Sequence, residues 1–134
     1  MNRLFWNRYN EGLLILRIAF GLMMMVHGWS KMQNWGAMSQ QFADPFGIGS
    51  APSLALAIFA EFFCSALLIL GLFTPLAAVF LIVTMLVAVF YAHGSDPWQK
   101  KELAFAYLMV YTTLLTAGAG TYSLDNKLFK GNTE

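Results

Sequence analysis

Residues 62–95 read FFCSALLILGLFTPLAAVFLIVTMLVAVFYAHGS and contain no Asp, Glu, Lys or Arg. Residues 103–124, LAFAYLMVYTTLLTAGAGTYSL, lack these charged residues as well. A helix needs about 20 mostly apolar residues to cross about 30 Å of hydrocarbon. Neither stretch alternates between polar and apolar residues, as the strands of a transmembrane barrel do. Both stretches therefore predict membrane-spanning helices.

The composition of the whole chain also indicates a membrane protein. Of its 134 residues, 58% are hydrophobic and 11% are charged, whereas soluble domains carry about 25% charged residues. This composition excludes a disordered chain and a soluble enzyme with an ordinary surface. The net charge of +1 is too small for the basic surface of a nucleic-acid-binding protein. Cys64 is the single cysteine, so the chain alone cannot form a disulfide or a dithiol redox pair.

The apolar pattern predicts an all-α integral membrane four-helix bundle. The expected spans cover about residues 12–32, 53–72, 76–92 and 103–119. Gly71 can end the second span, Thr74 can cap the third, and Pro75 suits its first turn. This connection is so short that spans two and three must be antiparallel neighbours. Residues 95–97, Ser-Asp-Pro, repeat the start signal before span four.

The loop between spans one and two, residues 33–52, has its own pattern. Large apolar side chains recur every three or four residues, at Trp29, Met32, Trp35, Met38 and Phe42. This spacing predicts a short helix at the membrane interface, which the Asp-Pro-Phe-Gly-Ile-Gly of residues 44–49 ends. Two interpretations stay open: the segment anchors the chain at the interface, or it forms a lid over a site in the bundle.

The orientation is encoded by a small difference in positive charge. With the N-terminus inside, the inner segments hold Arg3, Arg8, Lys127 and Lys130, and the outer loops hold Lys31, Lys100 and Lys101. The first group has four positively charged residues and the second has three. Positive charges are more frequent on the cytoplasmic side of a membrane, so this count favours the first group inside. Because four spans place both ends on the same side, we expect both termini in the cytoplasm.

Ionisable side chains within the spans identify the candidate site, because charges at this depth usually face the bundle. In span one, Arg17, Gly21, Gly28 and Lys31 lie along one stripe, and glycines let a second backbone approach closely. Glu61 lies in the middle of span two, about 13 Å from the outer surface.

Five ionisable groups from four spans are expected to meet in the outer half of the bundle: His27, Lys31, Glu61, His93 and Glu102. We expect a ligand pocket centred on Glu61, with His27 as its nearest titratable neighbour. Arg17, from the inner half, could form a structural ion pair with Glu61. The alternative is an ion-pair network with a purely structural role. No zinc or other metal signature is present, and no residue is identified as catalytic.

Several features occur along the chain in one order: Arg17, His27-Gly28-x-x-Lys31, Glu61, residues 71–78 (GLFTPLAA), His93, Glu102 and residues 118–125. In these features the chain resembles the DoxX family. The resemblance implies one transmembrane domain over residues 1–134 in the inner membrane of a bacterium. It also implies a link to redox chemistry. Some family members are subunits of an archaeal thiosulfate:quinone oxidoreductase, and a mycobacterial member is linked to a complex with superoxide dismutase and a sulfurtransferase.

Three functions remain open. The first is a redox-linked membrane subunit that binds a quinone or a similar amphipathic molecule and needs a partner subunit; any enzymatic activity would be that of a quinone-linked oxidoreductase. The second is a non-enzymatic assembly or scaffold subunit. The third is a small proton-linked permease, in which intramembrane Glu and His relay protons and a homo-oligomer forms the pathway. Membrane lipids are expected partners in all three, and nucleic acid in none.

Overall fold

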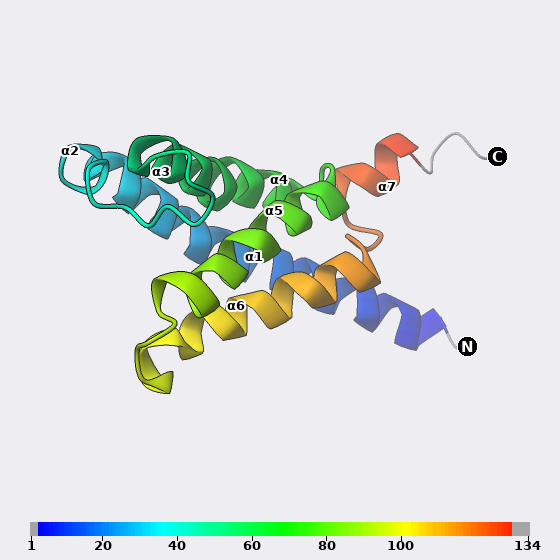
Figure 1. Cartoon of the computed structure of the whole chain (residues 1–134). Coiled ribbons are helices and arrows are strands. Elements are labelled where there is room, and N and C mark those ends of the chain that lie inside the picture. The colour runs from blue at the N-terminus through cyan, green and yellow to red at the C-terminus, as the bar shows by residue number, and fades with distance from the viewer. Residues whose placement is uncertain (1–2, 130–134) are drawn as a thin grey trace.

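The computed structural model describes residues 3–129, and every element within that range is helical. The elements are α1 (Arg3–Gln33), α2 (Trp35–Met38), α3 (Ser50–Ile58), η1 (Phe59–Cys64), α4 (Ser65–Leu70), α5 (Thr74–Val87), η2 (Ala88–Ala92), α6 (Trp98–Ala117) and α7 (Leu124–Phe129). The segments η1 and η2 are π-helical. Four long segments pack as a bundle: α1, the continuous α3–η1–α4, the continuous α5–η2, and α6 (Figure 1). The expected all-α bundle is confirmed.

Three of these segments are long and apolar enough to cross a membrane: Arg3–Gln33, Ser50–Leu70 and Thr74–Ala92. They contain the first three expected spans almost completely, and α1 begins about two turns before the expected start. The fourth segment, α6, has 20 residues, or about 30 Å of helix. Its first two turns carry the charges of residues 100–102, so its apolar part is shorter than that of the other three.

The connection between α4 and α5 shows where the capping predictions hold. Gly71 ends α4 in the left-handed conformation, with φ of 68°, as predicted. The prediction that Thr74 caps α5 is wrong. The carboxylate of Asp125 accepts hydrogen bonds from the backbone N–H of Phe73 (2.7 Å) and of Thr74 (2.9 Å). A charged group from the far end of the chain thus satisfies the first N–H groups of the helix.

The predicted cap of α6 is corrected as well. Pro97 precedes the helix with an extended backbone, at φ −64° and ψ 156°, and no side chain caps the helix. Helix α6 therefore begins at Trp98, one residue after Pro97, which the start signal predicts as the first helical residue. The side chain of Asp96 instead bonds to His93.

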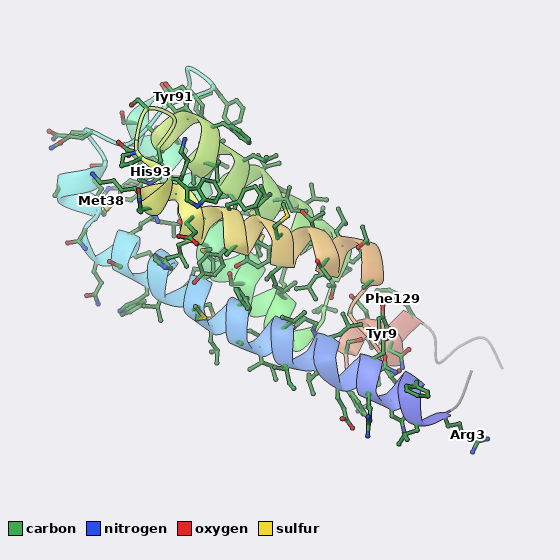
Figure 2. The ribbon with its side chains drawn as sticks, turned by 90° about the horizontal axis from the view of Figure 1, so that it is seen from below. Arg3, Tyr9, Met38, Tyr91, His93 and Phe129 are labelled. Atoms are coloured by element: carbon green, nitrogen blue, oxygen red, sulfur yellow. The ribbon has the colours of Figure 1, made fainter. Side chains whose placement is uncertain are left out.

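The two ends of the bundle differ in what they contain. Arg3 and Phe129 lie together at one end, and Met38, Tyr91 and His93 lie at the other (Figure 2). We call the first the terminal end. The second is the loop end, because residues 34–49 and 93–97 connect the helices there. An even number of passes through the bundle places both described ends of the chain on one side.

The predicted glycine stripe of α1 packs against the second segment. A Cβ atom on Gly28 would lie 2.8 Å from the Phe62 backbone nitrogen, and one on Gly21 would lie 2.5 Å from the side chain of Ile69. Such distances leave no room for a side chain. Helix α1 therefore contacts η1 and α4 almost backbone to backbone.

Candidate functional site

Lys31 and Glu61 form an ion pair at the loop end. The Lys31 Nζ donates to Glu61 Oε1 over 2.8 Å, and their side chains are 20% and 5% exposed, respectively. Lys31 lies in the last turn of α1, one turn after Gly28, and Glu61 lies in η1. The close approach of Gly28 to the backbone of Glu61 and Phe62 brings the two charges within reach of each other.

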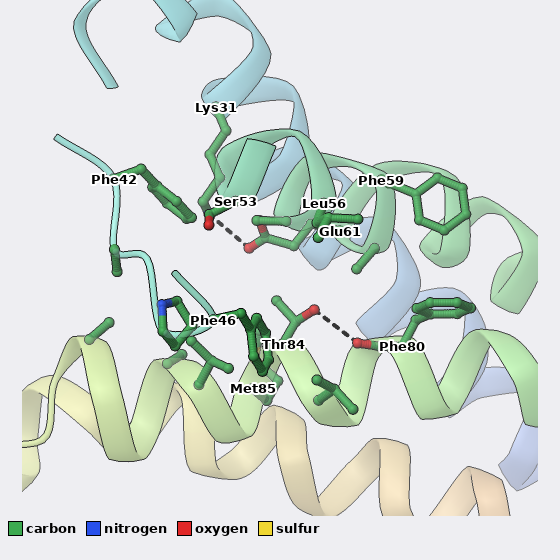
Figure 3. Close-up of a pocket in the computed structure, with 18 of the residues that line it drawn as sticks. Lys31, Phe42, Phe46, Ser53, Leu56, Phe59, Glu61, Phe80, Thr84 and Met85 are labelled. Carbon is green, nitrogen blue, oxygen red and sulfur yellow. Dashed lines mark hydrogen bonds and ion pairs between the residues drawn. The ribbon is translucent and has the colours of Figure 1, made fainter. Parts of the chain in front are cut away.

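The ion pair borders a cavity of about 330 Å³ between the second and third segments. Figure 3 shows Lys31, Ser53 and Glu61 on one wall and Thr84 and Met85 on the facing wall. The polar side chains of the lining are Lys31, Ser53, Glu61, Thr84 and His93. Most other lining residues are apolar, so the cavity has the size and character of a small-molecule site.

Both π-helical segments contribute to this cavity. Phe59, Ala60 and Glu61 come from η1, and Ala88 and Ala92 come from η2. A π-helical turn is wider than an α-helical one, is rare, and occurs mostly at functional sites. Both irregular turns lie in the wall of the cavity, so the helices depart from regular α-helical geometry where they form that wall.

One side of the cavity borders the surface that the spans present to lipid. Leu56, Phe59, Phe80 and Val83 line the cavity and are also substantially exposed on the outside of the bundle. The rings of Phe59 and Phe80 meet edge to face, with centroids 5.6 Å apart. An apolar molecule dissolved in the membrane would therefore meet the cavity between the second and third segments.

The loop after α2 covers the other side of the cavity. Phe42, Ala43, Pro45 and Phe46 contribute to its lining. This arrangement favours the lid interpretation of the segment. The expected interfacial helix is reduced to the four residues of α2, none of which is buried.

Asp44 holds this loop against the start of α3. Its Oδ1 accepts from the Ile48 N–H (2.9 Å) and the Ser53 hydroxyl (3.0 Å), and its Oδ2 accepts from the Gly49 N–H (2.9 Å). These hydrogen bonds, that of Gly49 above all, lower the pKa of the Asp44 carboxyl. Asp44 is therefore ionised at neutral pH, and its loop is pinned over the cavity.

His93 is paired with Asp96 at the end of η2. His93 Nδ1 and Asp96 Oδ2 are 2.8 Å apart, and this hydrogen bond is the main reason why the pKa of Asp96 is lowered. An ionised carboxylate can only accept, so Nδ1 of His93 carries the shared proton. Nε2 is then the ring nitrogen left for other partners, and His93 lines the cavity.

The five predicted ligand-binding residues fall into two groups. Lys31, Glu61 and His93 line the cavity, whereas its described lining includes neither His27 nor Glu102. His27 is exposed, and its ring lies edge to face on Tyr107, with centroids 6.0 Å apart. It is still an electrostatic neighbour of Glu61. Glu102 is exposed in the second turn of α6, which begins at Trp98, so the residue faces outward.

Glu61 has one oxygen that is not satisfied. Oε1 accepts from Lys31, but Oε2 is buried and has no hydrogen-bond partner among the described residues. A buried acceptor without a partner is rare in folded proteins and calls for an explanation. The Glu61 carboxylate is thus only partly used by the fold itself.

The expected pairing of Arg17 with Glu61 is wrong. Arg17 is 1% exposed and donates to four backbone carbonyls, those of Leu68 (3.0 Å), Ile69 (3.0 Å), Ala119 (2.8 Å) and Tyr122 (2.9 Å). Lys31, the partner that Glu61 has instead, lies about 21 Å farther along α1 than Arg17. Arg17 therefore belongs to the terminal end.

Three contributors to the site were not identified from the sequence. Asp96 acts through its hydrogen bond to His93. Asp44 and Ser53 bond to each other and hold the loop over the cavity. The spacing His93-x-x-Asp96 and the run Asp44-Pro45 before two glycines were the available signals. The π-helical turns have no signal in the sequence that distinguishes them from ordinary helix.

The sequence model described as DoxX matches residues 12–94 of this chain. Three relatives are similar over nearly their whole length. An uncharacterized protein of Haemophilus influenzae is 34% identical over 88% of this chain and 91% of its own. "Putative oxidoreductase CatD" of Bacillus subtilis is 31% identical over 92% of this chain and 91% of its own. "Inner membrane protein YphA" of Escherichia coli is 32% identical over 86% of this chain and 89% of its own. No solved structure matches the chain significantly.

Proposed function

The chain belongs to the DoxX family of membrane proteins, and from this membership and its cavity we propose that it is a redox-linked membrane subunit. In this proposal it binds a quinone or a similar amphipathic small molecule beside Lys31, Glu61 and His93. The observation that carries the proposal is an apolar cavity bordering lipid-facing side chains, with a partly satisfied buried carboxylate in its wall.

The cavity fits the two parts of such a molecule. The ring and the start of an alkyl tail need apolar walls, which Phe46, Leu56 and Met85 supply. The head group needs hydrogen-bonding partners: Lys31 supplies N–H donors for a ligand oxygen, and Nε2 of His93 supplies an acceptor for a ligand O–H. A tail would leave past the exposed lining side chains Leu56 and Val83 into the lipid, so the ligand needs no aqueous route.

The redox link requires a second protein. A quinone exchanges electrons as well as protons, and the single cysteine of this chain cannot form a dithiol couple. We propose that a partner subunit donates or accepts the electrons. The name of the B. subtilis relative, which contains the word oxidoreductase, supports this part of the proposal.

We propose that the chain crosses the bacterial inner membrane four times, with the terminal end in the cytoplasm. The shared end of Arg3 and Phe129 (Figure 2), the length of α6 and the name of the E. coli relative support it. The cavity then lies in the outer half of the membrane. Reporter fusions after residue 134 and within residues 34–49 should give opposite locations; the same location for both would contradict four spans.

A pair of matched substitutions tests the site. Ala88 lines the cavity, and Ala88→Phe would fill part of it, whereas Ala106 is exposed on α6 and away from the cavity. The purified variants, in lipid nanodiscs, are titrated with a short-chain benzoquinone by calorimetry. We expect Ala88→Phe to abolish binding and Ala106→Phe to bind as the parent does.

The alternatives give different results. A scaffold subunit would bind no benzoquinone, but it would copurify with partners from native membranes in both variants. A proton-linked permease would move protons across vesicle membranes without any added partner. Failure of the parent protein to bind benzoquinone would refute the proposed ligand.

A further inference from the structure

We infer that the cavity binds the reduced, dihydroxy form of its ligand, a hydroquinone, in preference to the oxidised quinone. In this inference His93 Nε2 accepts a ligand O–H, and Asp96 is a positioning residue that keeps the proton of His93 on Nδ1. The inference rests on the proposed function, because it specifies which form of a quinone-like ligand the same cavity takes.

The first step concerns the hydrogen-bonding character of His93. Its Nδ1 lies 2.8 Å from the carboxylate of Asp96, which accepts and cannot donate. A neutral imidazole has one donor and one acceptor nitrogen. With the donor facing Asp96, the remaining nitrogen of His93 presents an acceptor. The Asp96 contact therefore fixes how this ring can meet a ligand.

The second step concerns Lys31, which comes from a different helix. One of its three N–H groups bonds to Glu61 Oε1, which leaves donors for a ligand oxygen. The lining of the cavity thus presents a donor, Lys31 at the end of α1, and an acceptor, His93 at the end of η2.

The third step compares the two forms of the ligand. A hydroquinone oxygen both donates and accepts, so one hydroxyl can donate to His93 while the other accepts from Lys31. A quinone oxygen only accepts. It suits Lys31, but it would place its lone pairs against those of His93 Nε2. The reduced form satisfies both groups and the oxidised form only one.

The expected preference is moderate, because the His93 side chain is 42% exposed and water can partly replace the ligand. A single net hydrogen bond corresponds to roughly a three- to tenfold change in dissociation constant. We therefore expect the hydroquinone to bind about three to ten times more tightly than the quinone.

The experiment uses three probes with the same alkyl tail: a hydroquinone, its benzoquinone and its dimethyl ether. The ether keeps the shape of the hydroquinone but has no O–H donor. Each is titrated into the full-length protein in nanodiscs without oxygen. We expect the hydroquinone to bind most tightly, and the ether to bind no better than the quinone. Equal affinities, or a preference for the quinone, would overturn the inference and leave the proposed function standing. No binding of any probe would refute both.

Two substitutions test the assigned roles. His93→Phe keeps a ring but removes the acceptor, so hydroquinone affinity should fall to that of the quinone. Asp96→Asn can donate to Nδ1, which moves the proton to Nε2 and makes it a donor. The preference should then shrink or reverse, and Asp96→Glu should restore it. If Asp96→Asn weakened all three probes equally, Asp96 would have only a structural role, and the inference would fail.

Discussion

The two ends of the bundle each bury a charge, but they satisfy it to different degrees. At the terminal end, Arg17 donates to four backbone carbonyls. At the loop end, Glu61 is 4% exposed, and one of its oxygens has no partner within the described chain. Arg17 ties the second segment to the connection between α6 and α7, whereas Glu61 lies beside a cavity. Each nitrogen of the Arg17 side chain thus has a partner within the fold, whereas Oε2 of Glu61 keeps bonding capacity that a ligand can use.

The largest effect is expected at Arg17. Arg17→Met leaves four backbone carbonyls without their donor, and at about 1 kcal/mol for each hydrogen bond the loss comes to about 3–5 kcal/mol. The free energy of unfolding, measured in mixed micelles, should fall by about that amount. Arg8→Met, at an exposed position of α1, is the control and should change it by about 0.5 kcal/mol or less. Equal effects of the two substitutions would remove the distinction between the two ends.

A smaller loss of stability is expected where α1 meets η1. A Cβ on Gly28 would lie 2.9 Å from the carbonyl carbon of Glu61, so Gly28→Ala must push the helices apart, at about 1–3 kcal/mol. Gly12 is in the same helix and has open space around it. Gly12→Ala should therefore stabilise the protein by about 0.5–1 kcal/mol. In thermal unfolding, a lower midpoint for Gly28→Ala and a higher one for Gly12→Ala would support the close contact. A shift in the same direction for both variants would contradict it.

Glu61 is expected to matter more for binding than for stability. Glu61→Gln keeps an acceptor for Lys31 and removes the charge, so unfolding free energy should change by about 1 kcal/mol or less. Benzoquinone should bind about three- to tenfold more weakly, because Lys31 loses the ionic contact that orients it. Calorimetric titration measures the affinity for benzoquinone, and an unfolding experiment on the same preparation measures the free energy of unfolding. Full affinity in a well-folded variant would contradict the assignment of Glu61 to the site.

The smallest effect concerns the loop over the cavity. The pKa of Asp44 is lower in the folded chain than in the unfolded chain, so the unfolded chain binds more protons at acid pH. The contribution of Asp44 is therefore complete above the usual carboxyl pKa and disappears as the pH falls through the lowered value. The backbone amide resonances of Ile48 and Gly49 should shift over that acidic range. In Asp44→Asn these two amide resonances should stay constant over the same pH range. If they still shifted, a group other than Asp44 would be the one that titrates.

The site was only partly predictable, for reasons that particular residues illustrate. Glu61 and Lys31 were identified because charges within apolar runs are costly and must face a partner. His27 was expected beside Glu61 in the pocket, but its ring packs on Tyr107 outside the lining. A position on the helical stripe gives the side of α1, and the rotation of the neighbouring helices decides which cavity that side meets. Glu102 shows the same limit, since the start of α6 turns it outward.

The sequence by itself determined the membrane class, the ends of the second and third spans to within a few residues, and the close contact made by Gly21 and Gly28. These properties depend on composition, on local periodicity and on the lack of a side chain, which act over one or two helical turns. The tertiary structure alone decided which groups meet: Asp125 with the start of α5, Arg17 with four distant carbonyls, and His93 with the cavity. Hydrogen bonds depend on distances of about 3 Å. Only the packing of the helices, with the two π-helical turns that alter their register, sets distances between residues so far apart in the chain.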